Sequence, residues 1–353
     1  MVLASLALLL APAAALAASI PLQRTAALPA SFAIENLVTF GDSYTDEARL
    51  TYMKANHKLP PTDSMLPASD HTWSGGYAWG RLVANRTGAR YYDYAVAGAM
   101  CADALVPRRL NEIDAPFPSV RDYELSAFDQ GLQYDKLYPD RRDDNTVYAL
   151  WIGTNDLGID GFLGDRENAG QTLDSFVDCV WDVFDRIYET GGRRFVLMTE
   201  LPLETAPMYA RPAGYGHGND RYWADPSAYD VKAYLDRLAG SIKHVNEAFR
   251  SGADKYQHNN DGGRWQDATL SIFNVHQLWL DVRADPDKYL DAPADIDGAY
   301  RNCVNDCVYS QNPRTSFMWY DELHPSQRME EIFASNFIDV VQGKSKYGTD
   351  YCT

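Results

Sequence analysis

The sequence predicts an α/β fold in which helices cover both faces of a central parallel sheet. Short runs of β-branched and aromatic residues recur along the chain, and segments with apolar residues at helical spacing lie between or after them. Strands that alternate with helices form parallel sheets whose strands are buried on both sides. Of the 353 residues, 46% are hydrophobic and 23% are charged, so a full core can form.

Five apolar runs are predicted to be the strands of this sheet. They are residues 37–40, 91–96, 146–152, 194–199 and 270–274. Three long amphipathic segments are predicted to be helices, with apolar residues at helical spacing within 176–188, 231–249 and 329–341. Asp174 is the candidate N-cap of the first helix, which Gly191 and Gly192 end, and Ser326 is the candidate N-cap of the last.

The N-terminal segment is expected to lie outside the fold. An apolar run from Val2 to Leu10 leads into Ala15-Leu16-Ala17, which fits the A-x-A pattern of a signal-peptide cleavage site. The run is too short to span a bilayer, but no Lys or Arg precedes it, so an interfacial or membrane-anchored helix is the alternative. We expect a cleaved secretory signal at 1–17, a lead-in segment at 18–33 and a single domain at 34–353.

Charge and residue spacing indicate which partners and cofactors the protein is not expected to use. The formal net charge is −17, which disfavours nucleic acids and anionic membranes as partners because both attract basic patches. No second pair of Cys or His residues stands at the spacing of a zinc site. We therefore expect a secreted monomer that uses no metal and no cofactor.

The five cysteines are compatible with secretion, because disulfides persist outside the cell. Their odd number leaves at least one thiol unpaired within the chain. Cys303 and Cys307 flank a loop-like stretch and are predicted to form a small-loop disulfide. Cys179 lies on the apolar side of a predicted helix and is expected to be a buried free thiol. Asn85 begins an N-x-T sequon and is a candidate glycosylation site.

Small-residue motifs follow the first three predicted strands. They are Gly41-Asp42-Ser43, Ala97-Gly98-Ala99 and Gly153-Thr154-Asn155-Asp156. Parallel sheets bind ligands outside the carboxyl ends of their strands. The three motifs are therefore expected to meet at one site.

Ser43 is a candidate nucleophile. Gly41 allows a tight turn that would place Ser43 at a helix N-terminus, where backbone N–H groups can hold an oxyanion. The alternative is that Ser43 or Asp42 only caps the following helix. The stretch does not match the G-x-S-x-G elbow, because Thr45 stands where the second glycine belongs.

Further along the chain stand residues that could complete a catalytic set. Asp321 precedes His324 by three residues in "DELHP", a spacing at which the carboxylate can orient the imidazole. Gly98 can bring its backbone N–H close to a substrate oxygen, and the Asn155 amide can donate a second bond. Each pattern has a plain alternative, since D-x-x-H can be a surface pair and "GTND" an ordinary turn.

Together, "FGDSYTD", "AVAGA", "WIGTND" and "DELHP", in this order, resemble the SGNH or GDSL hydrolase superfamily. The resemblance extends from residue 36 to the last predicted helix, and it implies a three-layer flavodoxin-like fold with a central parallel sheet of about five strands. It also implies that Ser43 is the nucleophile, that His324 is the base and that Asp321 orients it. Gly98, Asn155 and the backbone N–H of Ser43 would form the oxyanion hole.

One position departs from the superfamily pattern. The second block often carries an asparagine a few residues before its glycine, and this chain has Asp93 instead. The local hydrogen bonding around Asp93 is therefore an open question. Asp46, close behind the candidate nucleophile, is expected to brace its loop.

The stretches "FGDSYTD" and "WSGGYAWG" and the acidic charge resemble the fungal carbohydrate esterases of family sixteen. That resemblance implies an acetylesterase that deacetylates hemicellulose oligosaccharides. Trp73, Tyr77 and Trp79 fall in a predicted loop and are candidates for stacking on sugar rings, with ordinary packing as the alternative. A secreted lipase or phospholipase with the same machinery is the nearest rival. A non-catalytic glycan-binding protein on the same fold is a more distant one.

Overall fold

The computed structural model describes residues 32–209, 222–223, 226–257, 264–303 and 306–352. Its main sheet has six strands in the order β12-β7-β6-β5-β1-β2. The strands are β1 (Asn36–Gly41), β2 (Arg90–Asp93), β5 (Thr146–Trp151), β6 (Arg194–Met198), β7 (Thr269–Phe273) and β12 (Gly348–Cys352). The first five are parallel, which confirms the five predicted strands and gives the doubly wound, flavodoxin-like order. The sixth, β12, pairs antiparallel with β7 and was not predicted.

Helices fill the connections between the strands. They are α1 (Arg49–Asn56), α2 (Trp79–Thr87), α3 (Leu125–Gly131), α4 (Thr154–Leu157), α5 (Leu173–Glu189), α6 (Val231–Gln257), α7 (Val275–Ala284) and α8 (Gln327–Val341). The three predicted helices correspond to α5, α6 and α8. Ser326 caps α8 as predicted, because its side chain accepts a hydrogen bond from Met329 N. The N-cap of α5 is Thr172 rather than Asp174, since Thr172 and Ser175 form a reciprocal capping box.

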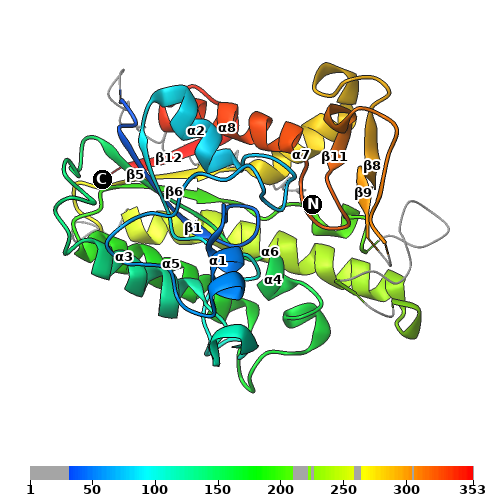
Figure 1. Cartoon of the computed structure of the whole chain (residues 1–353), viewed down its shortest axis with the longest axis horizontal. Helices are drawn as coiled ribbons and strands as arrows, with labels where there is room; N and C mark the ends of the chain where they lie inside the picture. Colours follow the sequence, from blue (N-terminus) through cyan, green and yellow to red (C-terminus); the bar gives the residue numbers. More distant parts are fainter. Residues whose placement is uncertain (1–31, 210–221, 224–225, 258–263, 304–305, 353) are drawn as a thin grey trace, which may run out of the picture.

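Figure 1 shows the three layers: α2 and α8 lie on one face of the sheet, and α3, α5 and α6 lie on the other. Aromatic side chains lock the layers to the sheet. Phe333 of α8 packs edge-on against Trp151 of β5 on one side. On the other side, Phe184 of α5 packs against Phe195 of β6.

An insertion between α7 and α8 forms a small lobe at one end of the sheet, drawn in brown and orange in Figure 1. It contains β8 (Asp295–Ala299) paired parallel with β11 (Phe317–Trp319), and the hairpin of β9 (Arg301–Asn302) and β10 (Val308–Tyr309). A separate two-stranded ribbon of β3 (Arg109–Leu110) and β4 (Ala115–Pro116) follows β2. The loop after β11 leads directly into α8 and carries Asp321 and His324.

Two disulfides join described cysteines. The predicted Cys303–Cys307 bridge closes the β9–β10 hairpin. The prediction of a free thiol at Cys179 is wrong, because Cys179 on α5 pairs with Cys101, whose Cα atom lies 6.3 Å away in the loop after β2. The two cysteines are 78 residues apart along the chain, so local sequence patterns could not predict their pairing. The side chain of Cys352 lies outside the described set.

Several sequence predictions concern targeting and the surface. The proposed signal segment at 1–17 lies outside the described residues. Asn85 is exposed on α2, and its glycosylation stays a prediction. Within the described ranges, no helix combines the length and the apolar character needed to cross a membrane.

Glu330 is a buried carboxyl group that joins α8 to α2. Its Oε1 accepts a hydrogen bond from Ser74 Oγ at 2.7 Å, and its Oε2 accepts one from Trp79 N at 2.9 Å. Burial raises the pKa of Glu330 to about 8, from an ordinary value of 4.5. The native state therefore keeps a proton that the unfolded chain releases between these two pH values.

This proton makes the stability of the fold dependent on pH. The pKa of Glu330 is higher in the folded state than in the unfolded chain. The contribution of protonated Glu330 to the free energy of unfolding is therefore complete below pH 4.5 and is lost as pH rises towards 8. The free energy of unfolding of wild type is expected to fall, relative to Glu330→Gln, by about 1.4 kcal/mol per pH unit within this window. Urea unfolding of both proteins at pH 5, 6, 7 and 8 measures the difference. Parallel stability curves for the two proteins would contradict this assignment.

Candidate active site

The three small-residue motifs meet at the carboxyl ends of neighbouring strands. In the sheet, β1 lies between β5 and β2, so the loops that follow these strands lie side by side. Asn155 Nδ2 on α4 donates a hydrogen bond to the carbonyl of Ala99 at 2.9 Å, which joins the third motif directly to the second. The loop from β11 brings Asp321 and His324 to the same place.

Ser43, His324 and Asp321 form a continuous hydrogen-bonded chain. Ser43 Oγ lies 2.8 Å from His324 Nε2, and His324 Nδ1 lies 2.8 Å from Asp321 Oδ1. Asp321 Oδ1 also accepts hydrogen bonds from the backbone N–H groups of Leu323 and His324, at 3.0 and 2.9 Å. Asp321 is fully buried, and Ser43 is only 6% exposed. This is the geometry in which an acid orients a base and the base activates a hydroxyl.

The backbone around Ser43 differs from the expected helix N-terminus. Residues 43–45 form a single turn in which Thr45 N and Asp46 N both donate to the carbonyl of Asp42, and α1 begins only at Arg49. The helix begins late because Asp46 caps it: Asp46 Oδ1 accepts hydrogen bonds from Ala48 N and Arg49 N at the start of α1. Ser43 is thereby left on a tight turn rather than inside a helix.

Three N–H groups are suited to hold an oxyanion. The backbone N–H groups of Ser43 and Gly98 form no hydrogen bond with any described residue. Gly98 has φ +83°, and a Cβ there would meet the ring of Phe117 at 3.0 Å, so this position requires glycine. Asn155 uses one amide hydrogen on Ala99, which leaves the other for a ligand.

Buried carboxylates hold the first two motifs in register. Glu124, just before α3, accepts hydrogen bonds from Gly41 N at 3.0 Å and from Val96 N at 3.1 Å. Asp46 Oδ2 accepts one from Ala97 N at 2.7 Å, so its predicted bracing role is confirmed and extends to the loop of Gly98. Glu124 was not predicted, because it acts on residues 83 and 28 positions away along the chain.

Asp93, which stands where the superfamily often has asparagine, forms a full set of local hydrogen bonds. Its Oδ1 accepts hydrogen bonds from Thr39 Oγ1 and Ala95 N, and its Oδ2 accepts one from Glu47 N. The carboxylate therefore connects the end of β2 to the nucleophile loop. Burial raises its pKa well above the ordinary value, and the charges of Asp46 and Glu47 add to this effect.

A second group of buried carboxyls lies next to the motif residues: Asp42 precedes Ser43, Asp156 follows Asn155, and Glu200 lies against Gly153. Burial raises the pKa values of Asp42 and Asp156 to about 7, and that of Glu200 well above its usual range. Asp42 accepts a hydrogen bond from Tyr44 N, and Asp156 accepts one from Cys101 N. Their protonated forms carry no negative charge, and burial favours these forms.

The three aromatic residues predicted to contact sugar lie in different environments. Trp79 is fully buried at the start of α2, packs on Phe337 and donates from Nε1 to Thr45 Oγ1 at 3.2 Å. The structure therefore contradicts a substrate contact by Trp79. Tyr77 and Trp73 are half-buried, and Trp73 stacks on His324 with ring centroids 5.4 Å apart.

Tyr222 is a site residue that the sequence did not reveal. Its hydroxyl lies 3.2 Å from Asp321 Oδ2 and 3.3 Å from His324 Nδ1. Arg301 on β9 also approaches Asp321, with Nη2 at 3.7 Å from Oδ2. Tyr222 lies 99 positions from Asp321 along the chain and Arg301 belongs to the β9 strand of the inserted lobe, and no motif surrounds either of them.

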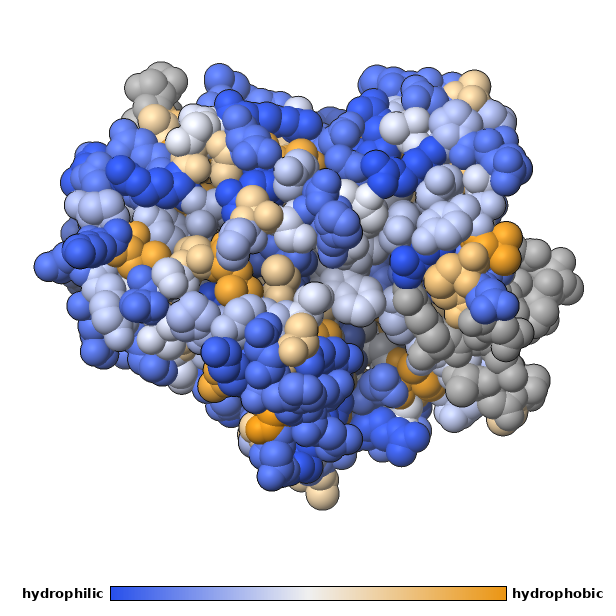
Figure 2. All heavy atoms as spheres, in the orientation of Figure 1, coloured by the Kyte–Doolittle hydropathy of each residue, from blue (hydrophilic) through white to orange (hydrophobic). Residues whose placement is uncertain are grey.

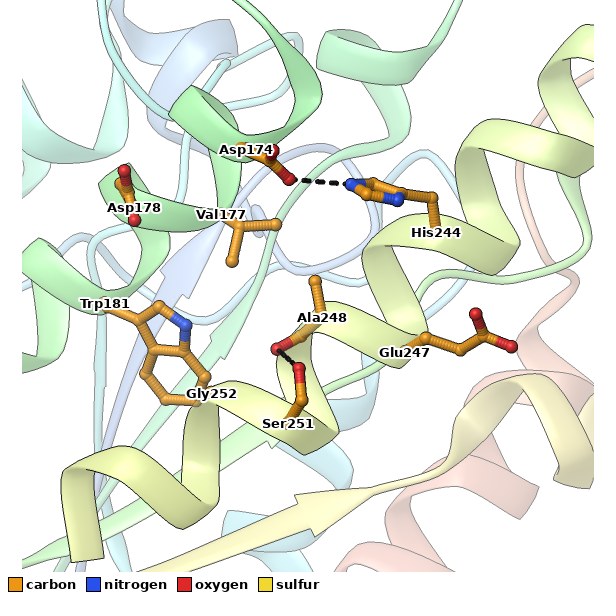
Figure 3. Close-up of a pocket in the computed structure, with 9 residues that line it drawn as sticks. All are labelled: Asp174, Val177, Asp178, Trp181, His244, Glu247, Ala248, Ser251 and Gly252. Carbon is orange, nitrogen blue, oxygen red and sulfur yellow. Dashed lines mark hydrogen bonds and ion pairs between the residues drawn. The ribbon is translucent and has the colours of Figure 1, made fainter. Parts of the chain in front are cut away.

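A separate groove between α5 and α6 does not have this chemistry. Its volume is about 600 Å³, and Figure 3 shows Asp174 and His244 facing each other across it, 2.7 Å apart. Ser251 lies in the same groove, but its hydroxyl donates to the carbonyl of Ala248. Within the described residues, no group of His, Cys, Asp and Glu side chains is arranged to hold a metal ion.

The chain is similar to several known proteins. The family described as "GDSL-like Lipase/Acylhydrolase" matches residues 37–337. An acetylesterase of Hypocrea jecorina is 37% identical over 317 residues, which cover 89% of this chain and 90% of that protein. An acetylesterase of Thermothelomyces thermophilus is 25% identical over 314 residues, with 87% and 88% coverage. The solved structure of LAE5, an alpha/beta hydrolase enzyme from the metagenome of Lake Arreo, has 13% identity and a TM-score of 0.42, with 89% and 98% coverage.

The family match spans all four sequence blocks that carried the resemblance, from the strand before Ser43 into the last helix. The relative from Hypocrea jecorina is similar over nearly the same extent. The predicted superfamily is therefore confirmed. The chain belongs to the GDSL-like lipase/acylhydrolase family.

Proposed function

We propose that this protein is a secreted acetylesterase that removes acetyl groups from acetylated hemicellulose oligosaccharides, with Ser43 as its nucleophile. The observation that carries the proposal is the hydrogen-bonded chain from Ser43 through His324 to Asp321. The identity of 37% to an acetylesterase supports the choice of acyl group. Secretion follows from the proposed signal at 1–17, and the two disulfides are consistent with it.

The reaction has two acyl-transfer steps. Ser43 Oγ attacks the acetyl carbonyl while His324 Nε2 takes its proton, and the N–H groups of Ser43, Gly98 and Asn155 hold the resulting oxyanion. The C–O bond to the sugar then breaks as His324 returns the proton to the departing hydroxyl. Water, deprotonated by His324, attacks the acetyl-enzyme and releases acetate, which restores Ser43.

Asn155→Ala is expected to lower kcat by about 10²–10³-fold without affecting the fold, because one of the oxyanion donors is lost. Asn168→Ala is a matched control, since Asn168 is also an asparagine that donates to a loop carbonyl, that of Ala104, but it is exposed. Hydrolysis of p-nitrophenyl acetate and thermal unfolding should be measured for both variants. Near-wild-type turnover by Asn155→Ala would refute its role as an oxyanion donor.

The character of the surface favours a soluble carbohydrate substrate over a lipid. Figure 2 shows a mostly hydrophilic face on which hydrophobic residues form small separate patches. The large hydrophobic side chains that are exposed within the described ranges are spread over the chain at Leu59, Tyr134, Tyr229, Leu280, Val308 and Tyr309. A lipase would need a contiguous apolar rim for acyl chains.

The substrate is tested with a chain-length series of p-nitrophenyl esters and with acetylated xylo-oligosaccharides. The proposal predicts that kcat/KM is highest for acetate and falls with longer acyl chains, and that acetate is released from the oligosaccharides. Activity that peaks at long chains would identify a lipase instead. Retained glycan binding without any ester hydrolysis would indicate a non-catalytic glycan-binding protein.

A further inference from the structure

The imidazole of His324 is enclosed by aromatic rings on several sides. Trp73 stacks on it with ring centroids 5.4 Å apart and an interplanar angle of 29°. The rings of Tyr44 and Tyr222 are steeply inclined to it, at 77° and 64°, with ring centroids 5.8 and 5.5 Å away. Of these three rings, Trp73 is the one that lies nearly parallel to the imidazole, so its indole face is turned towards the His324 ring.

The position of Trp73 is set by contacts on both sides of it. Thr72 Oγ1 donates to the carbonyl of Gly76, which closes the turn around Trp73. Ser74, the next residue, is fixed by its hydrogen bond to the buried carboxyl of Glu330. Gly75 has φ +73°, and a Cβ there would overlap the ring of Tyr320, so the turn packs tightly against the catalytic loop. These contacts fix the turn that carries Trp73, and so they hold its ring against His324.

The charge of His324 changes during the proposed reaction. The ring is neutral before attack and carries a positive charge while it holds the proton of Ser43. The face of an indole attracts a cation within about 6 Å of its centroid, and tryptophan does so more strongly than other aromatic residues. An interaction that strengthens as the charge develops lowers the barrier rather than only binding the substrate.

We propose that Trp73 is a positioning residue whose indole face stabilises the protonated form of His324 during acyl transfer. The inference rests on the proposed function, in which His324 is the general base. It assigns to Trp73 a role that does not involve the sugar. Trp73 is therefore expected to affect the hydrolysis of any ester, including one whose leaving group is not a carbohydrate.

The test replaces Trp73 with tryptophans that carry increasing numbers of ring fluorines, which weaken the negative face of the ring with little change in its shape. The assay uses p-nitrophenyl acetate, which has no sugar to stack. We expect kcat/KM to fall progressively along the series, by about 2- to 30-fold in total. The same substitutions at Trp265, which is buried against Asp185 and Phe195, are the matched control and should leave kcat/KM unchanged.

The pH profile separates this role from simple packing. Fluorination weakens the attraction of the indole face for the imidazolium and so favours the neutral base, and the acid limb of kcat/KM is expected to move to lower pH as fluorination increases. The other groups near the ring are Ser43, Asp321, Tyr222, Tyr44 and, beyond Asp321, Arg301. The substitutions leave all of them in place, so a graded shift reports on the indole face.

Each outcome is informative. An absence of any trend with fluorination on p-nitrophenyl acetate would overturn the proposal. So would a Trp73→Leu variant that raises KM for acetylated xylo-oligosaccharides only, since that result would make Trp73 a sugar contact. A trend on p-nitrophenyl acetate, in an enzyme that releases no acetate from xylo-oligosaccharides, would support this inference while refuting the proposed substrate.

Discussion

Ser43→Ala is expected to abolish ester hydrolysis, with a loss of kcat on the order of 10⁶-fold. The hydroxyl removed is the group that His324 Nε2 contacts at 2.8 Å, and no other described serine bonds to this imidazole. Without it, no acyl-enzyme can form, and the remaining oxyanion donors can assist only direct attack by water. Acetate release from acetylated xylo-oligosaccharides, followed over long incubations, measures the residual rate.

The fold is expected to survive this change. Ser43 is a small side chain on a turn, and its hydroxyl contributes no hydrogen bond to the backbone in the described structure. Thermal unfolding of Ser43→Ala should therefore match that of wild type closely. A folded variant that keeps even a hundredth of wild-type turnover would show that another group is the nucleophile.

Asp321→Asn is expected to lower kcat/KM by about 10⁴-fold. Asp321 Oδ1 accepts from two backbone N–H groups and faces His324 Nδ1, so the asparagine will place its oxygen there and its amide nitrogen at the position of Oδ2. The orientation of His324 is then preserved, and the loss comes from the missing negative charge opposite the imidazolium. The amide nitrogen also lies next to Arg301, whose charge loses its partner.

Asp321→Ala distinguishes charge from orientation. Alanine removes the acceptor for both backbone N–H groups as well as the charge, so it is expected to lower kcat/KM further and to reduce thermal stability. Steady-state rates on p-nitrophenyl acetate and unfolding curves for the two variants provide the comparison. Near-wild-type activity in Asp321→Asn would exclude the carboxylate from the catalytic set.

Much of the fold followed from local patterns. The five parallel strands are short and rich in β-branched and aromatic residues, and α5, α6 and α8 show clear helical spacing with polar starts. Because carboxyl ends of parallel strands share one edge of a sheet, the order of the motifs was enough to expect Ser43, Gly98 and Asn155 together. The D-x-x-H spacing likewise predicted the contact between Asp321 and His324.

What the sequence could not predict depends on residues that are far apart along the chain. The α2 helix begins at Trp79 without a capping side chain of its own, because the acceptor for Trp79 N is Glu330, 251 positions away. The sequence predicted a loop there, with Trp79 as a candidate sugar contact and ordinary packing as the alternative. The pairing of Cys101 with Cys179 and the approach of Tyr222 to His324 are equally non-local.

Labelling with a fluorophosphonate tests the central claim most directly, because the reagent captures an activated serine covalently. Peptide mapping after inactivation of wild type is expected to place the label on Ser43, and Ser43→Ala should take up none. Inactivation by a label at a different residue, or full activity in wild type that resists labelling, would contradict Ser43 as the nucleophile.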